Sequence, residues 1–283
     1  MNVDPNVDQW IGKSESSNER IAAFPANAMA ATLNQCGLIY KDGDPLPHLW
    51  HWLYFLQVFN LEDKGYDGHP KLGGFLPPLE LPRRMWAGSR LKFLAPMHIG
   101  AQLNKTSIIK AVTQKKGRSG ALAFVTVLHQ VHDGETLCIE EEHDIVYREK
   151  INADVPEVLP SMAPSEWAFS KHINPDPVLL FRYSALTFNG HRIHYDQPFC
   201  TGTEGYQGLV VHGPLMATML LDLVRFELPN AVVCAFEFRA LAPVFETDEF
   251  SIHGQPNADG KTINLWVRRD DGTLAIQAQA TIK

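Results

Sequence analysis

The chain has few of the features that mark secreted, membrane-spanning or disulfide-bonded proteins. Its 283 residues include only four cysteines, which are scattered and form no C-x-x-C pair, so we expect reduced thiols and a cytoplasmic location. The first twenty residues are mostly polar and lack the apolar core of a secretory signal, and we expect them to be loosely held. No apolar run approaches the roughly 18 residues of a membrane-spanning helix, so we expect no membrane partner.

Basic charge is scarce as well. The 25 Lys and Arg residues are outnumbered by 32 Asp and Glu residues, which gives a net charge of -7 and a pI near 5.9. Nucleic acids and anionic membranes bind basic surfaces, so this balance argues against both as partners. A Walker phosphate loop and a G-x-S-x-G nucleophile elbow are also absent from the sequence, which argues against nucleotide hydrolysis and serine-esterase chemistry.

Two sets of β-prone runs divide the chain into two similar units. The sequence RLKFLAP at 90–96 is echoed by EFRALAP at 237–243, which indicates a repeat of whole domains. We therefore predict an α+β fold with two antiparallel sheets, each wrapped around one helix and joined edge to edge. The predicted strands are 107–113, 121–131 and 136–147 in the first unit, and 231–242, 250–254, 263–269 and 274–281 in the second.

The C-terminal unit contains the clearest helix signal. An apolar run follows Gly213, and a proline comes second, where it suits the first turn of a helix, so we predict a buried helix over 214–226. In the N-terminal unit the aromatic segment 46–59, which includes Trp50, takes the corresponding place. It fits either a packed core or an aromatic wall for a ligand. A shorter helix is predicted over 27–35, with its first residue, an asparagine, as the cap.

Irregular segments suggest the domain boundaries. Prolines at 156, 160, 164, 175 and 177 indicate a linker. We predict an N-terminal domain over 1–155, a linker over 156–177 and a C-terminal domain over 178–283. Residues 62–79 form another irregular stretch, rich in Gly and Pro. A loop of this length inside a compact chain is often a lid or a binding loop.

Ionisable side chains crowd the segment before the predicted buried helix. A histidine can act as a general base near neutral pH, and a glycine at a helix start leaves a backbone N–H for a developing oxyanion. Together they suit adding or removing water across a double bond conjugated to a carbonyl. The same residues would also fit a helix cap with structural histidines. His191, His194 and Asp196 could supply three metal ligands, but no second ligand cluster supports them, so we expect no metal.

This segment resembles the MaoC-type hydratases and dehydratases of the double hot-dog fold. In that family a D-x-N-P-x-H segment precedes V-H-G at the start of the central helix, and the matching positions here read NGHRIH at 189–194 and VHG at 211–213. The resemblance implies that His194 is catalytic, that Gly213 is the oxyanion donor and that an Asn189 stands where the family has aspartate. The longer run YSALTFNGHRIHYD and an upstream FLPP are similar to the subgroup of hydroxyacyl-thioester dehydratase 2 and the mesaconyl-C4-CoA and itaconyl-CoA hydratases.

The resemblance also implies a fold and an activity. It implies a degenerate N-terminal hot dog that shapes an acyl tunnel, with catalysis in the C-terminal one. The implied reaction is reversible hydration of a C5 dicarboxyl-CoA thioester such as itaconyl-CoA or mesaconyl-C4-CoA, giving citramalyl-CoA in itaconate degradation. The alternatives are a (3R)-hydroxyacyl-thioester dehydratase of fatty-acid-type metabolism and a non-catalytic hot dog that binds acyl thioesters. Coenzyme A is then part of the substrate, no cofactor is expected, and by analogy the chain would form a homodimer.

Each site residue receives an expected role. His194 would activate the water and return its proton while Asn189 holds that water. A second proton carrier would come from His191, Asp196 or Glu204. A free carboxylate would be bound by Arg192 or Arg182, although either arginine could instead face solvent or pair with a nearby acid. The full set of expected substrate contacts is Arg192, Arg182, His191, Tyr195, His212, Trp50, Arg239 and Lys92. Of these, Lys92 or Arg239 would meet coenzyme A phosphates, or the basic turn 115–118 would do so.

Overall fold

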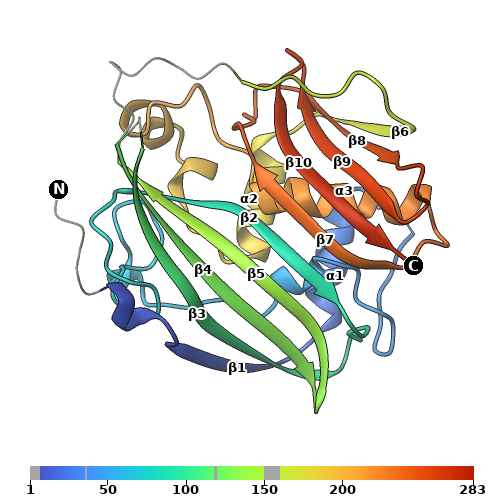
Figure 1. The fold of residues 1–283 in the computed structure, drawn as a ribbon, viewed down its shortest axis with the longest axis horizontal. Helices are drawn as coiled ribbons and strands as arrows, with labels where there is room; N and C mark the ends of the chain where they lie inside the picture. The colour runs from blue at the N-terminus through green and yellow to red at the C-terminus, as the bar shows by residue number, and fades with distance from the viewer. Residues whose placement is uncertain (1–6, 36, 118–119, 150–159) are drawn as a thin grey trace.

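One antiparallel sheet of ten strands runs through both halves of the chain (Figure 1). The computed structural model describes residues 7–35, 37–117, 120–149 and 160–283. The strands are β1 (Ser14–Arg20), β2 (Arg83–Phe93), β3 (Gln102–Gly117), β4 (Gly120–Asp133), β5 (Thr136–Arg148), β6 (Phe169–Ile173), β7 (Val233–Ala240), β8 (Phe250–Pro256), β9 (Thr262–Arg269) and β10 (Leu274–Ile282). Their order in the sheet is β1-β3-β4-β5-β2-β7-β10-β9-β8-β6, and the expected α+β class is confirmed.

Three helices and several short helical turns complete the fold. The helices are α1 (Ala23–Thr32), α2 (Pro177–Leu186) and α3 (Gly213–Glu227). The 3-10 turns are η1 (Val7–Trp10), η2 (Trp50–Leu53), η3 (Leu61–Asp63) and η4 (Arg192–His194), and η5 (Phe199–Thr203) is π-helical. Read outwards from the middle of the sheet, β2, β5, β4, β3 and β1 match β7, β10, β9, β8 and β6 in order. The chain is therefore built from two equivalent halves.

The halves join where β2 pairs with β7. Arg90 lies opposite Glu237, so the two strands that carry the repeated sequence are direct neighbours. A side chain on Gly88 would collide with the carbonyl oxygen of Phe238 on the other half, so this crossing requires glycine. The predicted edge-to-edge pairing of the two sheets is confirmed.

Helix α3 lies at the centre of the C-terminal half, behind the sheet in Figure 1. Every residue from Leu215 to Val224 is buried, as expected for a helix that is apolar on nearly all sides. The one buried carboxylate of this helix, Asp222, is paired with Arg225 at 2.9 Å and accepts a hydrogen bond from Gln35 at 2.7 Å. No helix in the described part of the chain is long and apolar enough to cross a membrane.

The N-terminal half has the single turn η2 where the C-terminal half has α3. Beneath η2 lies Glu141 of β5, which is 3% exposed. It accepts hydrogen bonds from Trp52 Nε1–H at 3.0 Å and Ser89 Oγ–H at 2.9 Å, and its second partner on η2 is His51 Nε2 at 3.1 Å. Burial alone would raise the pKa of Glu141, but the His51 hydrogen bond and nearby imidazoles hold it well below its usual value. Trp50 is fully buried in the core, so the packed-core interpretation of this segment is the one observed.

Three local expectations differ from the structure. Residues 14–20, expected to be loosely held, form β1 and pair with β3, but they are exposed on both faces and so carry no alternating pattern. Within the expected linker, 169–173 form the edge strand β6, which pairs with β8, while the boundary at 155–156 lies outside the described residues. Asn27 lies inside α1 instead of capping it, because its side chain makes two hydrogen bonds to the backbone of Tyr40.

Candidate active site

His194 is buried and fixed in one orientation at the end of η4. Its Nδ1–H donates to the carbonyl oxygen of Val210 at 2.6 Å, and because a carbonyl can only accept, this bond sets the tautomer. The lone pair of Nε2 is then left free to accept a proton. Burial lowers the pKa of His194 to about 4, so the ring is neutral at pH 7. The residue expected to be the base is present in its basic form.

A second imidazole supports the first. The ring of His212, the residue that precedes α3, stacks on His194 with centroids 3.6 Å apart and planes 18° apart. On its far side, Nε2 of His212 lies 2.8 Å from the hydroxyl oxygen of Ser184 on α2. Burial lowers the pKa of His212 well below its ordinary value, so the two rings stack without charge repulsion. His212 thus fixes the position of His194 and links it to α2.

Gly213 opens α3 directly beside this stack. Among the described residues its backbone N–H has no hydrogen-bond acceptor, as expected at a helix start, where the first N–H groups lack partners within the helix. A Cβ built on Gly213 would meet no atom within 4 Å, so there is open space beside its backbone. The positive end of the helix macrodipole favours negative charge there. Neutral His194 and the Gly213 donor therefore lie together, as the sequence predicts.

Asn189 closes the turn that leads into η4. Its side-chain oxygen accepts the backbone N–H of His191 at 3.0 Å, so only its amide N–H groups are left for a ligand. This turn is touched by the backbone of the loop 62–79, at Gly68 and Gly190. A Cβ on Gly68 would overlap the carbonyl oxygen of Gly190, so this contact depends on glycine. The loop expected to be a lid or binding loop therefore packs on the catalytic turn.

That loop carries two groups that the sequence analysis did not single out. Asp67 Oδ2 lies 2.8 Å from His69 Nδ1, and the His69 ring lies 4.2 Å from His191, centroid to centroid. The His191 ring is in turn perpendicular to His194, with centroids 5.4 Å apart. Nothing local marks Asp67 and His69 as functional, since only the fold brings 67–69 against 189–194. The available signal was a D-G-H sequence inside a long Gly-rich and Pro-rich loop.

Arg192 and Tyr195 brace the same turn. Arg192 pairs with Asp196 at 2.7 Å, donates to the carbonyl oxygen of Tyr66 at 3.0 Å and stacks over Phe199. This is the internal pairing that the sequence left open, and it engages the guanidinium that was expected to bind a substrate carboxylate. The Tyr195 hydroxyl donates to the carbonyl of Gly190 at 2.9 Å. Both side chains hold the loop and the turn together.

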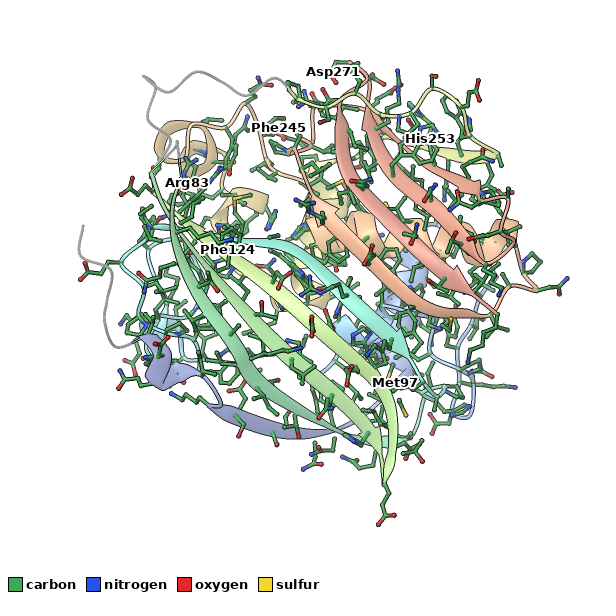
Figure 2. The ribbon with its side chains drawn as sticks, in the orientation of Figure 1. Arg83, Met97, Phe124, Phe245, His253 and Asp271 are labelled. Carbon is green, nitrogen blue, oxygen red and sulfur yellow. The ribbon has the colours of Figure 1, made fainter. Side chains whose placement is uncertain are left out.

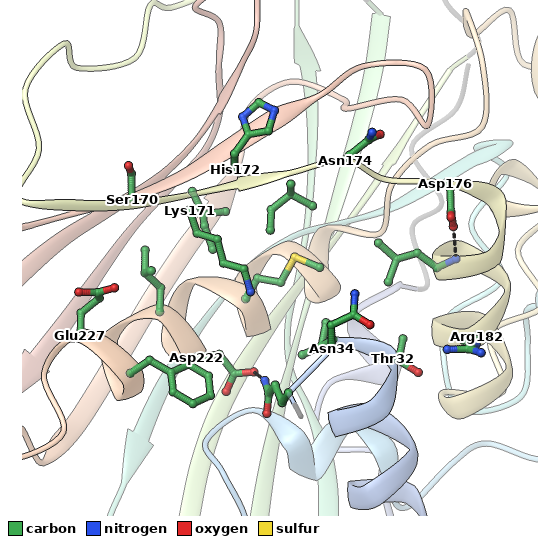
Figure 3. A pocket seen from close by; sticks show the side chains of 18 of the residues that line it. Thr32, Asn34, Ser170, Lys171, His172, Asn174, Asp176, Arg182, Asp222 and Glu227 are labelled. Atoms are coloured by element: carbon green, nitrogen blue, oxygen red, sulfur yellow. Dashed lines mark hydrogen bonds between the residues drawn. The ribbon is translucent and has the colours of Figure 1, made fainter. Parts of the chain in front are cut away.

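Four of the expected substrate contacts lie away from the His194 cluster. Lys92 is exposed on β2 and paired with Glu140, and Arg239 is exposed on β7, because outward and inward positions alternate along these strands. Trp50 packs beside α3 near Arg225, at the end of the helix far from Gly213. Arg182 lines a cavity of about 700 Å³ between α1, β6, α2 and α3 (Figure 3).

The two acids held in reserve for the second proton are both engaged elsewhere. Asp196 pairs with Arg192 and accepts the backbone N–H of Phe199 at 3.1 Å. Glu204 is 7% exposed and pairs with Arg83 at 3.0 Å. Arg83 lies at the start of β2 (Figure 2). His191 is the reserve candidate that contacts His194, ring against ring.

Comparisons with known proteins show the family and the fold of the chain. Residues 49–246 match the family model described as hydroxyacyl-thioester dehydratase type 2. A mesaconyl-C(4)-CoA hydratase from Chloroflexus aurantiacus is 47% identical over 270 residues, which cover 95% of each chain. A MaoC-like dehydratase from Phytophthora capsici has a similar structure, with a TM-score of 0.70, 13% identity and 98% of each chain covered. A Mycobacterium tuberculosis protein described as a double hot-dog fold gives a TM-score of 0.58 at 15% identity, covering 96% of each chain, and the expected double hot-dog fold is confirmed.

Proposed function

Because this chain belongs to the hydroxyacyl-thioester dehydratase type 2 family, we propose that it adds water reversibly across the double bond of an α,β-unsaturated CoA thioester. The observation that carries the proposal is the neutral ring of His194 beside the open backbone N–H of Gly213. Hydration of a conjugated thioester needs a base for the water and a donor for the enolate oxygen, and these two groups supply them.

The reaction follows from these positions. Nε2 of His194 takes a proton from a water molecule as the water oxygen bonds to the β carbon. The double-bond electrons move toward the thioester carbonyl, whose oxygen is held by the Gly213 N–H at the positive end of α3. The amide N–H groups of Asn189 are free to donate to the water oxygen. A proton delivered to the α carbon completes the addition, and no cofactor takes part.

The acyl group that we favour is a C5 dicarboxylic one, mesaconyl-C4 or itaconyl, hydrated to citramalyl-CoA. The support is the 47% identity to a protein named mesaconyl-C(4)-CoA hydratase. A free carboxylate needs a cation, and Arg192 is already engaged by Asp196. Arg84 makes no ion pair with any described residue, and it lines a small cavity together with Asp67 and His191. We therefore assign the carboxylate contact to Arg84.

Turnover of itaconyl-CoA, mesaconyl-C4-CoA and crotonyl-CoA, measured side by side with the mass gain of one water, tests the proposal. We expect the first two to be preferred, and His194→Ala to keep less than about a tenth of the activity, since general bases contribute ~10²–10⁴-fold. Arg84→Leu should lower kcat/KM for the dicarboxyl thioesters at least about tenfold more than for crotonyl-CoA, because one charge-assisted pair is lost. Arg192→Leu is the control and should affect all three alike.

Other outcomes would point to the alternatives. Preference for crotonyl-CoA or longer chains would make the protein a (3R)-hydroxyacyl-thioester dehydratase of fatty-acid-type metabolism, as the family description suggests. Binding of enoyl-CoA without turnover would indicate a non-catalytic acyl-thioester binding protein. A role in itaconate degradation, a homodimeric assembly and a cytoplasmic location stay predictions.

A further inference from the structure

The hydration scheme leaves the second proton without a source among the acidic residues of the C-terminal half. Asn189 stands where the family resemblance places an aspartate, and an amide cannot exchange protons. Asp196 and Glu204 are held in ion pairs with arginines. His191 is then the remaining candidate to deliver a proton to the α carbon, and its own proton has to be supplied by another group.

The loop from the N-terminal half brings such groups to the turn. Asp67 Oδ2 lies 2.8 Å from His69 Nδ1, and the backbone N–H of His69 donates to Oδ1 of the same carboxylate at 3.0 Å. The side chain of Asp67 is 14% exposed and that of His69 is 24% exposed. The pair is anchored to the other half because the Arg192 N–H donates to the Asp67 carbonyl at 2.8 Å. The carboxylate thus fixes the His69 ring from one side.

His191 lies between this pair and the base. Its ring centroid is 4.2 Å from that of His69 and 5.4 Å from that of His194. Beside it is a cavity of about 10 Å³, lined among others by Asp67, Arg84 and His191, which is roughly the space of one water molecule. Asp67, His69, His191 and His194 therefore lie in one row of neighbouring side chains.

The same three side chains, Asp67, His69 and His191, offer ligand atoms close enough together to hold a metal ion. Two observations favour proton chemistry instead. The Asp67 carboxylate is already engaged by the ring and the backbone of His69. The guanidinium of Arg84 lies near enough to disfavour positive charge on both His69 and His191, and it would oppose a cation in the same way.

We propose that Asp67, His69 and His191 form a proton relay that provides the second acid–base function of the hydratase, with His191 as the catalytic residue that faces the substrate. His69 and Asp67 are positioning residues that act through it. The proposal rests on the hydratase function given above. It assigns part of the catalytic machinery to the N-terminal half.

In the hydration direction the relay completes the proton balance. The water oxygen bonds to the β carbon, and one water proton passes to Nε2 of His194. The double-bond electron pair becomes the new bond between the α carbon and a proton given by one ring nitrogen of His191. The other nitrogen of His191 takes a proton from the His69 imidazolium in the same step, so His191 only exchanges tautomers. His69 is reloaded from solvent and His194 loses its proton there, so one water is added in total.

The local electrostatics agree with these roles. Burial, together with the neighbouring rings and Arg84, lowers the pKa of His191 strongly, so His191 stays neutral and suits a relay better than a proton store. The pKa of His69 is lowered on balance, mainly by burial, and the hydrogen bond and charge of Asp67 limit that fall, so the alkaline limb set by His69 should lie below the ordinary imidazole range. Of the two rings, His69 is the one that a carboxylate stabilises when charged. His194 bonds to Val210 through Nδ1, and its pKa near 4 keeps it a base.

The pH profile of kcat/KM for the best thioester substrate tests the relay. The wild-type profile should be bell-shaped, with an acid limb from His194 and an alkaline limb from loss of the His69 proton. His69→Gln should lower kcat about 10²-fold or more, leave KM within about threefold and abolish the alkaline limb. Asp67→Asn should move that limb to lower pH, because the imidazolium loses its carboxylate. His69→Ala should regain activity when imidazole is added.

His172→Gln is the matched control, since His172 also contacts a carboxylate, Glu249 at 2.7 Å, but lies on β6 outside the cluster. It should leave the profile unchanged. If the wild type turns over thioesters and His69→Gln is equally active, or loses activity with its alkaline limb intact and no imidazole rescue, the relay is wrong while the hydratase function stands. A wild type without turnover would refute both. One bound zinc per chain, with activity lost on chelation, would replace the relay by a metal site.

Discussion

Replacing Glu141 by glutamine should destabilise the protein without affecting its chemistry. The carboxylate is 3% exposed and its oxygens have three partners at 2.9 to 3.1 Å, so the variant loses the buried charge that all three hydrogen bonds engage. Bonds to a charged group are worth roughly 1.5–3 kcal/mol each, and breaking a buried pair costs about 3–5 kcal/mol. Because glutamine keeps one acceptor oxygen, we expect a loss of about 3 kcal/mol in the free energy of unfolding.

Urea unfolding with linear extrapolation measures this loss. Glu140→Gln is the matched control on the same strand, since Glu140 makes an exposed ion pair with Lys92, and it should cost less than about 1 kcal/mol. Ser89→Ala removes one of the three bonds and should cost about 1 kcal/mol. For Glu141→Gln, kcat/KM measured without urea, where the variant is folded, should stay within about threefold of wild type, because the network fixes η2 and not His194. A loss under 1 kcal/mol, or normal stability with activity reduced more than tenfold, would refute a purely structural role of this segment.

Three further predictions concern the site and its supports. Gly213→Ala should leave the melting temperature unchanged or slightly higher, since a Cβ there meets no atom within 4 Å and alanine is the better helix former by ~0.5–1 kcal/mol. The same variant should lower kcat/KM at least about tenfold, because it places a methyl group beside the substrate carbonyl. The pKa of His194 is about 4 when folded against 6.5 when unfolded, so the unfolded chain binds this proton first as pH falls. Other buried histidines also have lowered pKa values, so the comparison is with His194→Gln: between pH 6.5 and about 4 the wild type should lose about 3 kcal/mol more in the free energy of unfolding, and equal losses would contradict the neutral buried ring. Arg83→Met should cost about 3 kcal/mol in urea unfolding because it leaves Glu204 buried without its partner, and adding Glu204→Leu should restore part of that loss, whereas purely additive losses would refute the coupling.

The strands and the central helix could be predicted from the sequence because their signals are local. Strands β4 and β5 alternate between buried and half-exposed positions over part of their length, and α3 is a continuous apolar run after a proline. Strand β1 gave no such signal, since it is exposed along both faces and held only by its pairing with β3. Helix α2 was missed although Asp176 caps it and Pro177 begins it, a pair that marks a helix start.

The candidate site was predictable only where its residues lie in one stretch. His194, His212 and Gly213 fall within twenty residues of one another, so the motif and the helix start place them together. Asp67 and His69 lie more than a hundred residues away and reach His191 through a contact between two glycine backbones. No local pattern encodes such a contact.

The contact between Gly68 and Gly190 also bears on how a duplicated fold can diverge. With two equivalent halves in one chain, each half needs to keep only what the other lacks. The N-terminal half has only the turn η2 in the place that α3 takes in the C-terminal half, but its loop lies against the turn of the C-terminal half that carries His191 and His194. Drift in that loop is therefore limited by chemistry performed in the other half. A chimera that exchanges one half between homologues should lose activity unless the loop and the turn are exchanged together.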